Sequence, residues 1–181
     1  MHNNGQDNEQ YDLILAANDE ILNEKSKRVY IAKEVLGKGT FGQVVHVSEK
    51  KSGRDFAAKI IKSKNNYAKF VLNYEVKILS VLNRYEKKLR DGKVTLKGVE
   101  PKKNSRIISL YEKFMFKDHM VLIMEKLDMS VYDLLEIADF QGFTLNVIRK
   151  FGRHILEGLC ILKKNKIVHC DLKPENILLV K

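Results

Sequence analysis

The sequence has few of the residues that mark secreted, fibrous or membrane proteins. Its 181 residues include only two cysteines and two prolines. Two cysteines are too few for a disulfide framework, so Cys160 and Cys170 are expected to be reduced thiols. The longest apolar runs, such as residues 120–124, are far shorter than the ~20 residues of a transmembrane helix. The first ten residues lack the pattern of a secretory signal. These absences predict an intracellular protein without a membrane span, in the cytoplasm or the nucleus.

Acidic residues are too few to balance the basic ones. Lysine and arginine total 33 against 23 aspartates and glutamates, a formal net charge of +10. Between Arg84 and Arg106 there are nine basic and three acidic residues, so this segment carries six of those charges. A local basic excess indicates either an anionic partner or a solvated surface, and the solvated surface is the simpler interpretation. Because residues 84–106 lack periodicity and contain two glycines and a proline, we expect a surface loop or a basic insertion.

The remaining composition is that of an ordinary globular protein. With 44% hydrophobic and 31% charged residues, the chain has room for one domain, or one and a fraction. Residues 1–10 are polar and predict a flexible tail. Residues 11–22 have room for a turn or two of helix, which would need a surface to dock on. We therefore expect residues 1–29 to be a flexible tail with a short docking segment.

Residues 30–125 show the pattern of a small α+β lobe. Three short segments rich in Val, Ile and aromatic residues predict an antiparallel meander: 30–36, 43–48 and 55–62. Residues 66–83 have helical spacing, with Leu72, Leu79 and Leu82 on one stripe and Glu75 set among them. Residues 107–116 and 120–125 flank Lys117-Asp118-His119 and predict a hairpin that closes the sheet at five strands. The expected architecture is thus five antiparallel strands with one helix.

After residue 125 the pattern becomes helical. Residues 130–138 predict a short helix, and residues 145–165 predict a long one with Thr144 as its N-cap. Two further short strands are expected at 167–168 and 177–180, around a polar loop. A second, helical lobe therefore begins here.

A glycine-rich loop lies between the first two predicted strands. It reads Gly37-Lys38-Gly39-Thr40-Phe41-Gly42-Gln43-Val44. Glycines at these positions allow backbone N–H groups to approach an anion such as a phosphate. In a dinucleotide-binding fold this pattern leads into a helix, whereas here it leads into a strand. The spacing GxGxxGxV therefore favours the protein-kinase type of loop.

Lys59 and Glu75 are charged residues at positions where the pattern is apolar. Strand alternation places Lys59 on the same face as Ala57 and Ile61. A lysine pointing to solvent is the commoner situation, but an inward ammonium needs a partner. Glu75 interrupts an apolar helix stripe and also needs one. We therefore predict a Lys59–Glu75 ion pair that holds the lysine for nucleotide phosphates.

The segment His169-Cys170-Asp171-Leu172-Lys173-Pro174-Glu175-Asn176 is the most specific feature. Phosphoryl transfer to a hydroxyl requires a carboxylate to orient the nucleophile, a cation on the phosphoryl group and an oxygen ligand for magnesium. Asp171, Lys173 and Asn176 would supply these three. Each residue alone would fit a plain polar turn. The whole segment, at this distance behind the glycine loop and Lys59, favours phosphoryl transfer.

From Tyr30 onward the chain resembles the first part of a eukaryotic protein kinase. The sequence HCDLKPENILL, with Cys170 where most kinases have arginine, is similar to the DYRK family of dual-specificity tyrosine-regulated kinases. The glycine loop and the 127–135 segment agree with that, and residues 11–22 resemble the Yak-type branch. A thiol at position 170 cannot clamp a phosphorylated loop as arginine does, because it cannot make the charge-assisted contact.

The resemblance implies an ATP site and a mechanism. The adenine slot would be roofed by Leu36, Val44 and Ala57, with Met124 as gatekeeper and residues 125–127, including Glu125 and Leu127, as hinge. Residues 30–125 would be the kinase N-lobe and 126–181 the hinge and the start of the C-lobe. ATP and Mg²⁺ would be the cofactors, with Ser/Thr of proteins as acceptor and a tyrosine of its own activation loop as a further target.

The resemblance also implies parts beyond Lys181. The DFG aspartate, the activation loop and most of the helical lobe are expected to follow, so an exposed apolar face is expected on the 145–165 helix.

Two other functions compete with a kinase. The chain could be a catalytically inactive kinase fragment that serves as a binding or regulatory module. Alternatively, residues 84–106 could bind nucleic acid, but they contain no aromatic residue beyond Tyr85, and single-strand binders interleave aromatic with basic residues. Nucleic-acid binding is therefore the less favoured alternative.

Overall fold

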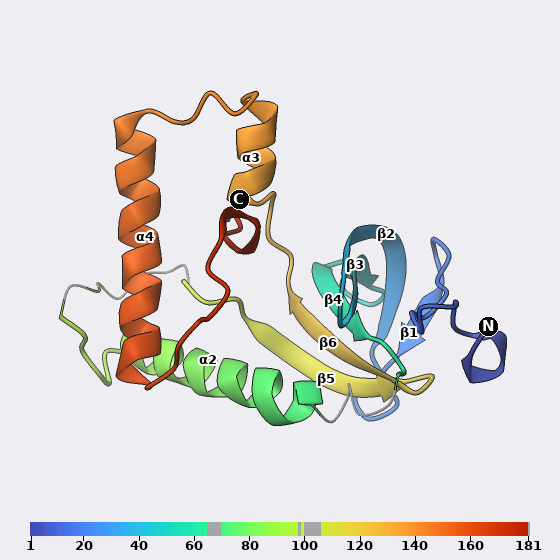
Figure 1. Ribbon diagram of the computed structural model, residues 1–181. Coiled ribbons are helices and arrows are strands. Elements are labelled where there is room, and N and C mark those ends of the chain that lie inside the picture. The colour runs from blue at the N-terminus through green and yellow to red at the C-terminus, as the bar shows by residue number, and fades with distance from the viewer. Residues whose placement is uncertain (65–69, 98, 100–105, 181) are drawn as a thin grey trace. The chain divides into compact units, whose positions relative to one another are not determined.

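The computed structural model describes residues 1–64, 70–97, 99 and 106–180. It divides into two compact units (Figure 1). The first unit comprises Met1–Lys77 and Ser109–Lys126, and the second comprises Ile78–Ile108 and Leu127–Lys181. No helix in the described ranges is long and apolar enough to cross a membrane. Both cysteines are free and exposed.

The first unit is built on a curled antiparallel sheet (Figure 1). Six strands lie in the order β1-β2-β3-β4-β6-β5. Their bounds are Glu20–Leu22, Val29–Gly39, Gly42–Glu49, Asp55–Ile61, Leu110–Phe116 and His119–Glu125 for β1 to β6 in chain order. The predicted meander is therefore present as β2–β3–β4, and the predicted hairpin as β5–β6.

The sixth strand, β1, differs from the expectation of a helical turn within residues 11–22. Ile21 pairs with Tyr30 of β2, and both side chains are almost fully buried. An extended segment can hydrogen-bond to the edge of β2 while burying Ile21, which an isolated turn of helix cannot do. The expectation of five strands was therefore one strand short.

Strand alternation separates two faces of the sheet. One face contributes Val45, Ala58 and Val121, among others, to the core of the first unit. Val44 and Lys59, the chain neighbours of Val45 and Ala58, point to the opposite face. A two-residue turn, Lys117-Asp118, joins β5 to β6 with positive φ at both positions, 47° and 62°. His119, expected in that turn, is instead the first residue of β6.

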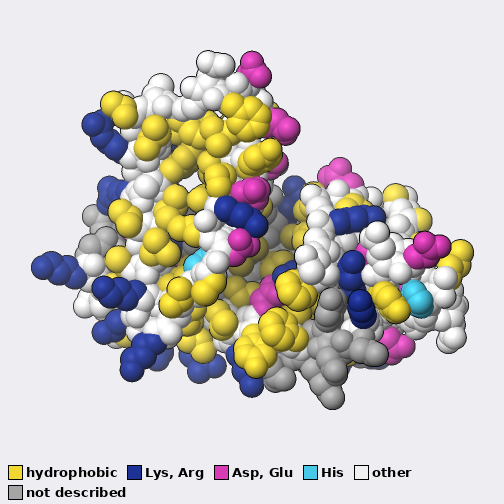
Figure 2. Space-filling view, in the orientation of Figure 1, with side chains coloured by type: hydrophobic (Ala, Val, Ile, Leu, Met, Phe, Trp, Pro, Cys, Tyr) yellow, Lys and Arg dark blue, Asp and Glu magenta, His cyan; other side chains and the backbone are white. Residues whose placement is uncertain are grey.

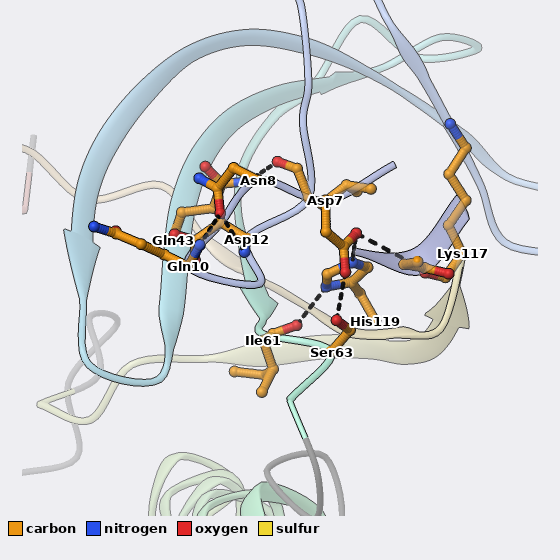
Figure 3. A network of polar contacts seen from close by, with 11 residues as sticks. Asp7, Asn8, Gln10, Asp12, Gln43, Ile61, Ser63, Lys117 and His119 are labelled. Carbon is orange, nitrogen blue, oxygen red and sulfur yellow. Dashed lines mark hydrogen bonds and ion pairs between the residues drawn. The ribbon is translucent and has the colours of Figure 1, made fainter. Parts of the chain in front are cut away.

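The N-terminal residues do not behave as the flexible tail that the composition predicted. Asp7 is fully buried, and its Oδ1 lies 2.8 Å from Nε2 of the equally buried His119 (Figure 3). Ser63 donates its hydroxyl hydrogen to Asp7 Oδ2, and Asn3 donates to Asp7 Oδ1 at 3.3 Å. On its other side, His119 Nδ1 donates to the carbonyl oxygen of Ile61 at 2.7 Å. The polar residues at the N-terminus thus fill a polar site at the ends of β4 and β6.

The second unit consists of helices, with bounds close to those predicted except in the basic segment. A π-helical turn of the first unit, Leu72–Val76, leads into α2, Lys77–Arg90, which belongs to the second unit from Ile78 on. The start of the 84–106 segment is therefore helical and not a loop. The expected start of this helix, at residues 66–69, lies outside the described residues. Helices α3 and α4 span Val131–Ile137 and Leu145–Lys164. Ser130 and Asp133 form a capping box on α3, whereas the side chain of Thr144 makes no capping bond on α4.

The strands expected at 167–168 and 177–180 are absent from the described residues. Leu178 makes only an isolated bridge with Ser130, and Pro174–Asn176 form a 3-10 turn. The core of this unit joins Leu82 and Leu89 of α2 to Ile161 and Leu162 of α4.

Much of the apolar side of α4 is exposed, as the resemblance predicted. Leu145 is 66% and Leu156 is 63% exposed. Figure 2 shows hydrophobic side chains gathered over α3 and α4. The second unit therefore presents an apolar surface that the described residues do not cover.

Replacing Asp7 with alanine tests whether the N-terminal residues stabilise the sheet. Asp7→Ala removes the buried acceptor of hydrogen bonds from His119, Ser63 and Asn3 and leaves those donors unsatisfied, so it is expected to lower the free energy of unfolding by about 2 kcal/mol. Glu9→Ala removes an exposed carboxylate from the same segment and should change stability by less than about 0.5 kcal/mol. Urea denaturation followed by circular dichroism measures both. Equal stabilities of the two variants would mean that the N-terminal residues are not anchored.

The Asp7 pair also predicts a pH dependence. Burial alone would raise the pKa of Asp7, but hydrogen bonds from Ser63 and His119 outweigh it and lower the pKa below its ordinary value of 3.8. A lowered pKa stabilises the folded state above the ordinary value, and this stabilisation is lost as the pH falls through the folded-state value. Asp7→Asn should therefore lose less stability than the wild type when the pH is lowered through this range. The same loss of unfolding free energy with falling pH in Asp7→Asn and in the wild type would contradict this.

Candidate active site

The glycine-rich loop is the hairpin that joins β2 to β3. Gly39 pairs with Gly42, with Thr40 and Phe41 at the tip, and Lys38 pairs with Gln43. Residues 37–41 are exposed. Leu36, just before the loop, is 46% exposed. The loop is thus an exposed hairpin of the first unit.

Gly42 is the loop glycine that the fold itself requires. Its φ is +152°, and a Cβ at this position would lie 2.0 Å from the carbonyl oxygen of Ile60 in β4. No side chain fits there without moving the backbone of β4. A Cβ on Gly37 would meet no atom within 4 Å. Packing therefore explains Gly42, whereas Gly37 leaves open space beside the loop, as a bound anion would need.

Gln43 has a role that the sequence did not predict. Its side chain is 4% exposed, and Nε2 donates to the carbonyl oxygen of Leu13 at 2.7 Å. Leu13 belongs to the N-terminal segment, whose packing on the sheet had no sequence signal. The Gln43 side chain is therefore committed to the core, and only its backbone remains available to the loop.

The sheet face opposite the core groups the predicted nucleotide-binding side chains of the first unit. Val44 of β3 pairs with Lys59 of β4, and Ala57 pairs with Met124 of β6. Directly paired residues of antiparallel strands share a face, and Ala57 and Lys59 are two residues apart. Ala57 and Met124 are each 6% exposed. The result is a small apolar surface with one lysine on it.

Lys59 makes the ion pair that the sequence predicted. Its Nζ lies 2.6 Å from Oε1 and 2.8 Å from Oε2 of Glu75, which is in the π-helical turn before α2. The two side chains are 24% and 33% exposed, so both charges are partly removed from water. Two short contacts to one carboxylate fix the ammonium in place. Its exposed fraction leaves it accessible to a ligand on the same sheet face.

The 169–176 segment of the second unit is a turn organised around Asp171. Asn176 Nδ2 donates to Asp171 Oδ2 at 2.9 Å and to the Asp171 carbonyl oxygen at 2.8 Å. Lys173 Nζ lies 3.1 Å from Asp171 Oδ1. The structure thus brings together the three residues that the sequence singled out here.

Two neighbours support this turn. His169 Nδ1 accepts a hydrogen bond from the Asp171 backbone N–H at 3.3 Å, and Cys170 has a positive φ of 65°. His169 had no assigned role in the sequence analysis, although its place two residues before Asp171 is a signal for it. Cysteine gives no signal for positive φ, so the shape of this turn could not be predicted from residue type.

The electrostatics of the turn favour an ionised Asp171. The hydrogen bond from Lys173 is the main cause that lowers the pKa of Asp171, and the hydrogen bond from Asn176 lowers it further. The carboxylate is exposed and accepts bonds at both oxygens. It therefore stays negatively charged well into the acidic range.

Asn176 has one amide oxygen that could hold a metal ion. Its amide nitrogen is engaged with Asp171, while its Oδ1 makes no hydrogen bond within the described part of the chain. An amide oxygen beside a carboxylate fits the preference of Mg²⁺ for oxygen ligands. The described residues contain no cluster of three or more His, Cys, Asp or Glu that would hold a metal on its own.

The two predicted hinge residues fall in different units. Glu125 ends β6, and its backbone N–H donates to the Ser109 carbonyl oxygen at 3.0 Å, while its Oε1 accepts from the Ser109 N–H at 2.6 Å. Leu127 begins the last segment of the second unit and is half-buried. The Glu125 backbone N–H and side chain are thus both engaged with Ser109.

Comparison with known proteins agrees with these features. Residues 30–181 match the family model described as "Protein kinase domain". The dual specificity protein kinase YAK1 homolog of Arabidopsis thaliana is 40% identical over 179 residues, 99% of this chain and 17% of that protein. Dual specificity protein kinase YAK1 of Saccharomyces cerevisiae is 38% identical over 177 residues, 98% of this chain and 20% of its own length.

A third relative extends the similarity. Dual specificity tyrosine-phosphorylation-regulated kinase 3 of Macaca fascicularis is 35% identical over 150 residues, 83% of this chain and 24% of that protein. The chain thus spans between 17% and 24% of the length of these three relatives. The match over residues 30–181 and these identities show that the chain belongs to the protein kinase family and is similar to YAK1 and the dual specificity tyrosine-phosphorylation-regulated kinases.

Proposed function

We propose that this chain provides the ATP-binding half and the catalytic turn of a protein kinase. The reaction is transfer of the γ-phosphoryl group of Mg-ATP to a serine or threonine hydroxyl of a protein, with tyrosine autophosphorylation as in a dual-specificity enzyme. The observation that carries the proposal is the Lys59–Glu75 ion pair, which stands on the apolar face formed with Val44 and Ala57. A fixed, accessible ammonium beside an apolar surface suits a ligand with a flat base and a polyphosphate.

The first unit would bind the nucleotide. The apolar side chains of Val44, Ala57 and Met124 offer a surface for the adenine ring, with Leu36 at its edge. Lys59 would hold phosphate oxygens, and Glu75 keeps its ammonium in place. Backbone N–H groups of the exposed glycine-loop residues would donate to the phosphates. Positioning and charge neutralisation are the main tasks of a phosphoryl-transfer site.

The catalytic turn would act on the acceptor hydroxyl. An ionised Asp171 can accept the hydrogen bond of the hydroxyl and orient its oxygen toward the phosphoryl group. Because the pKa of Asp171 is lowered, it is a weak base, and orientation is its larger contribution. Lys173 would neutralise negative charge that develops on the transferred group. Asn176 would contribute its Oδ1 to Mg²⁺, which supplies charge neutralisation of the phosphates when bound.

Loss of the Lys59 ammonium should weaken nucleotide binding. Lys59→Ala is expected to reduce the affinity of the chain for Mg-ATP by at least about tenfold, because a partly desolvated cation no longer meets the phosphates. Glu75→Gln leaves the ammonium unpaired and should weaken binding less. Lys113→Ala removes an exposed lysine of β5 and is the matched control. Isothermal titration calorimetry measures all three. Unchanged affinity in Lys59→Ala would overturn the assignment of this face.

Phosphoryl transfer tests the second unit independently. In a chain that carries a whole kinase domain, Asp171→Asn should reduce kcat by at least about a hundredfold while leaving the affinity for ATP nearly unchanged. The amide preserves size and hydrogen bonding but lacks the charge. Transfer of ³²P from labelled ATP to a protein substrate measures the rate. Near-normal turnover by this variant would exclude a catalytic role for the Asp171 carboxylate.

The cationic neighbour of Asp171 sets a measurable pKa. Lys173→Ala should raise the pKa of Asp171 toward its ordinary value of 3.8, because the carboxylate loses its largest stabilising contact. Asn176→Ala should raise it by a smaller amount. Lys164→Ala, which removes an exposed lysine of α4, is the control and should leave it unchanged. Carbon-13 NMR titration of the Asp171 carboxyl measures the values, and an unshifted pKa in Lys173→Ala would contradict this account.

A further inference from the structure

The basic segment singled out in the sequence has no task in the proposed reaction. Its helical part lies in the second unit, at the C-terminal end of α2, and four exposed cations lie there: Arg84, Lys87, Lys88 and Arg90. We call these four residues the basic α2 surface. Figure 2 shows Lys and Arg side chains projecting along the outer edge of this helix.

Helix geometry explains why these charges are gathered. The buried residues Leu82, Glu86 and Leu89 are three to four positions apart and line the side of α2 that faces its own core. Arg84, Lys87 and Lys88 have the same spacing but lie on the opposite side. The amphipathic character of α2 therefore sorts its cations onto one surface.

The two described acidic residues of the same segment, Glu86 and Asp91, are engaged away from this surface. Glu86 is only 7% exposed, and its Oε1 accepts the backbone N–H of Arg106 at 2.8 Å. Asp91 is paired with Lys93 at 3.4 Å. In the described ranges, no ion pair involves any of the four residues of the basic α2 surface. The net charge of +6 counted for residues 84–106 thus includes positive charges of the basic α2 surface that no described acidic side chain pairs with.

The neighbouring side chains favour a peptide over a nucleic acid as the anionic partner. The ring of Tyr85 packs against the hydrophobic core, and its hydroxyl oxygen is buried. It is therefore turned away from the surface and cannot stack on a base, the contact that single-strand binders use. Val81, one helical turn before Tyr85, is 43% exposed and lies three residues before Arg84. The surface combines cations with an exposed apolar side chain.

We propose that the basic α2 surface, with Val81, binds an acidic peptide segment of a partner protein that also carries apolar residues. Glutamate or aspartate side chains would pair with Arg84, Lys87 and Lys88, and an apolar side chain of the partner would pack on Val81. Such binding does not require nucleotide, so its test is independent of the proposed kinase activity.

The probe is a fluorescein-labelled peptide of twelve residues, in which every fourth residue is leucine and the others are glutamate. Its binding is measured by fluorescence anisotropy at two salt concentrations. The triple variant Arg84→Gln, Lys87→Gln, Lys88→Gln should weaken binding by roughly tenfold or more, because three exposed charge pairs are lost. Glutamine keeps helix propensity, and circular dichroism verifies that α2 is retained. The charge-matched control replaces three exposed lysines elsewhere, Lys51, Lys113 and Lys150, with glutamine and should bind like the wild type.

Two further measurements separate the proposal from its alternatives. Val81→Ser should weaken binding of the peptide several-fold and leave binding of a twelve-nucleotide single-stranded RNA unchanged, because the RNA contact is purely electrostatic. The proposal is overturned if the control triple variant loses as much affinity as the α2 variant, or if the peptide shows no binding up to about 1 mM. Tighter binding of the RNA than of the peptide, again lost in the α2 variant, would identify the surface as a nucleic-acid interface instead.

Discussion

The Lys59–Glu75 ion pair is the interaction on which the candidate nucleotide site depends. Lys59 lies on the apolar sheet face with Ala57, and Glu75 lies in the π-helical turn before α2. A partly desolvated ammonium without its carboxylate would draw water onto that surface or turn away from it. Paired, it keeps an orientation that neither β4 nor the helix could impose alone. The remaining site residues of the first unit are useful only because this cation is held among them.

The register of β4 determines which face of the sheet carries Lys59. In β4, Ala58 and Ile60 belong to the core while Ala57 and Lys59 point to the opposite face. A slip of one residue would bury Lys59 in the core and expose Ala58. The backbone of Gly42 in the glycine hairpin packs closely against Ile60 of β4, since a Cβ at position 42 would lie 2.0 Å from the Ile60 carbonyl oxygen. This close packing holds β3 and β4 in one register. The loop glycine and the site lysine are thus linked by the backbone of one strand.

Sequence reasoning succeeded where the information is local. The meander, the β5–β6 hairpin and the Lys59–Glu75 pair follow from alternation, turn residues and a spacing of 16 residues. It failed for contacts between distant segments: Asp7 and His119 are 112 residues apart, and no periodic pattern marks a polar segment that fills a polar site. The sequence did not predict that α2 continues to Arg90. The buried positions Leu82, Glu86 and Leu89 are separated by lysines and arginines and include a glutamate, so they form no clear apolar pattern. The shape of the Asp171 turn depends on a positive φ at Cys170, which its residue type does not indicate.

The N-terminal segment links the fold to the site more closely than its composition suggests. It reaches the end of β4 and the start of β6 through Asp7, and it reaches the glycine hairpin through the bond from Gln43 to Leu13. These strands, together with β3, carry Val44, Lys59 and Met124 on their other face. A polar segment on the core side therefore restrains the same backbone that positions the nucleotide face. Side chains of the core and of the site alternate along β4. A change in the pairing of β4 on the core side therefore also moves Lys59 and Ala57 on the other face.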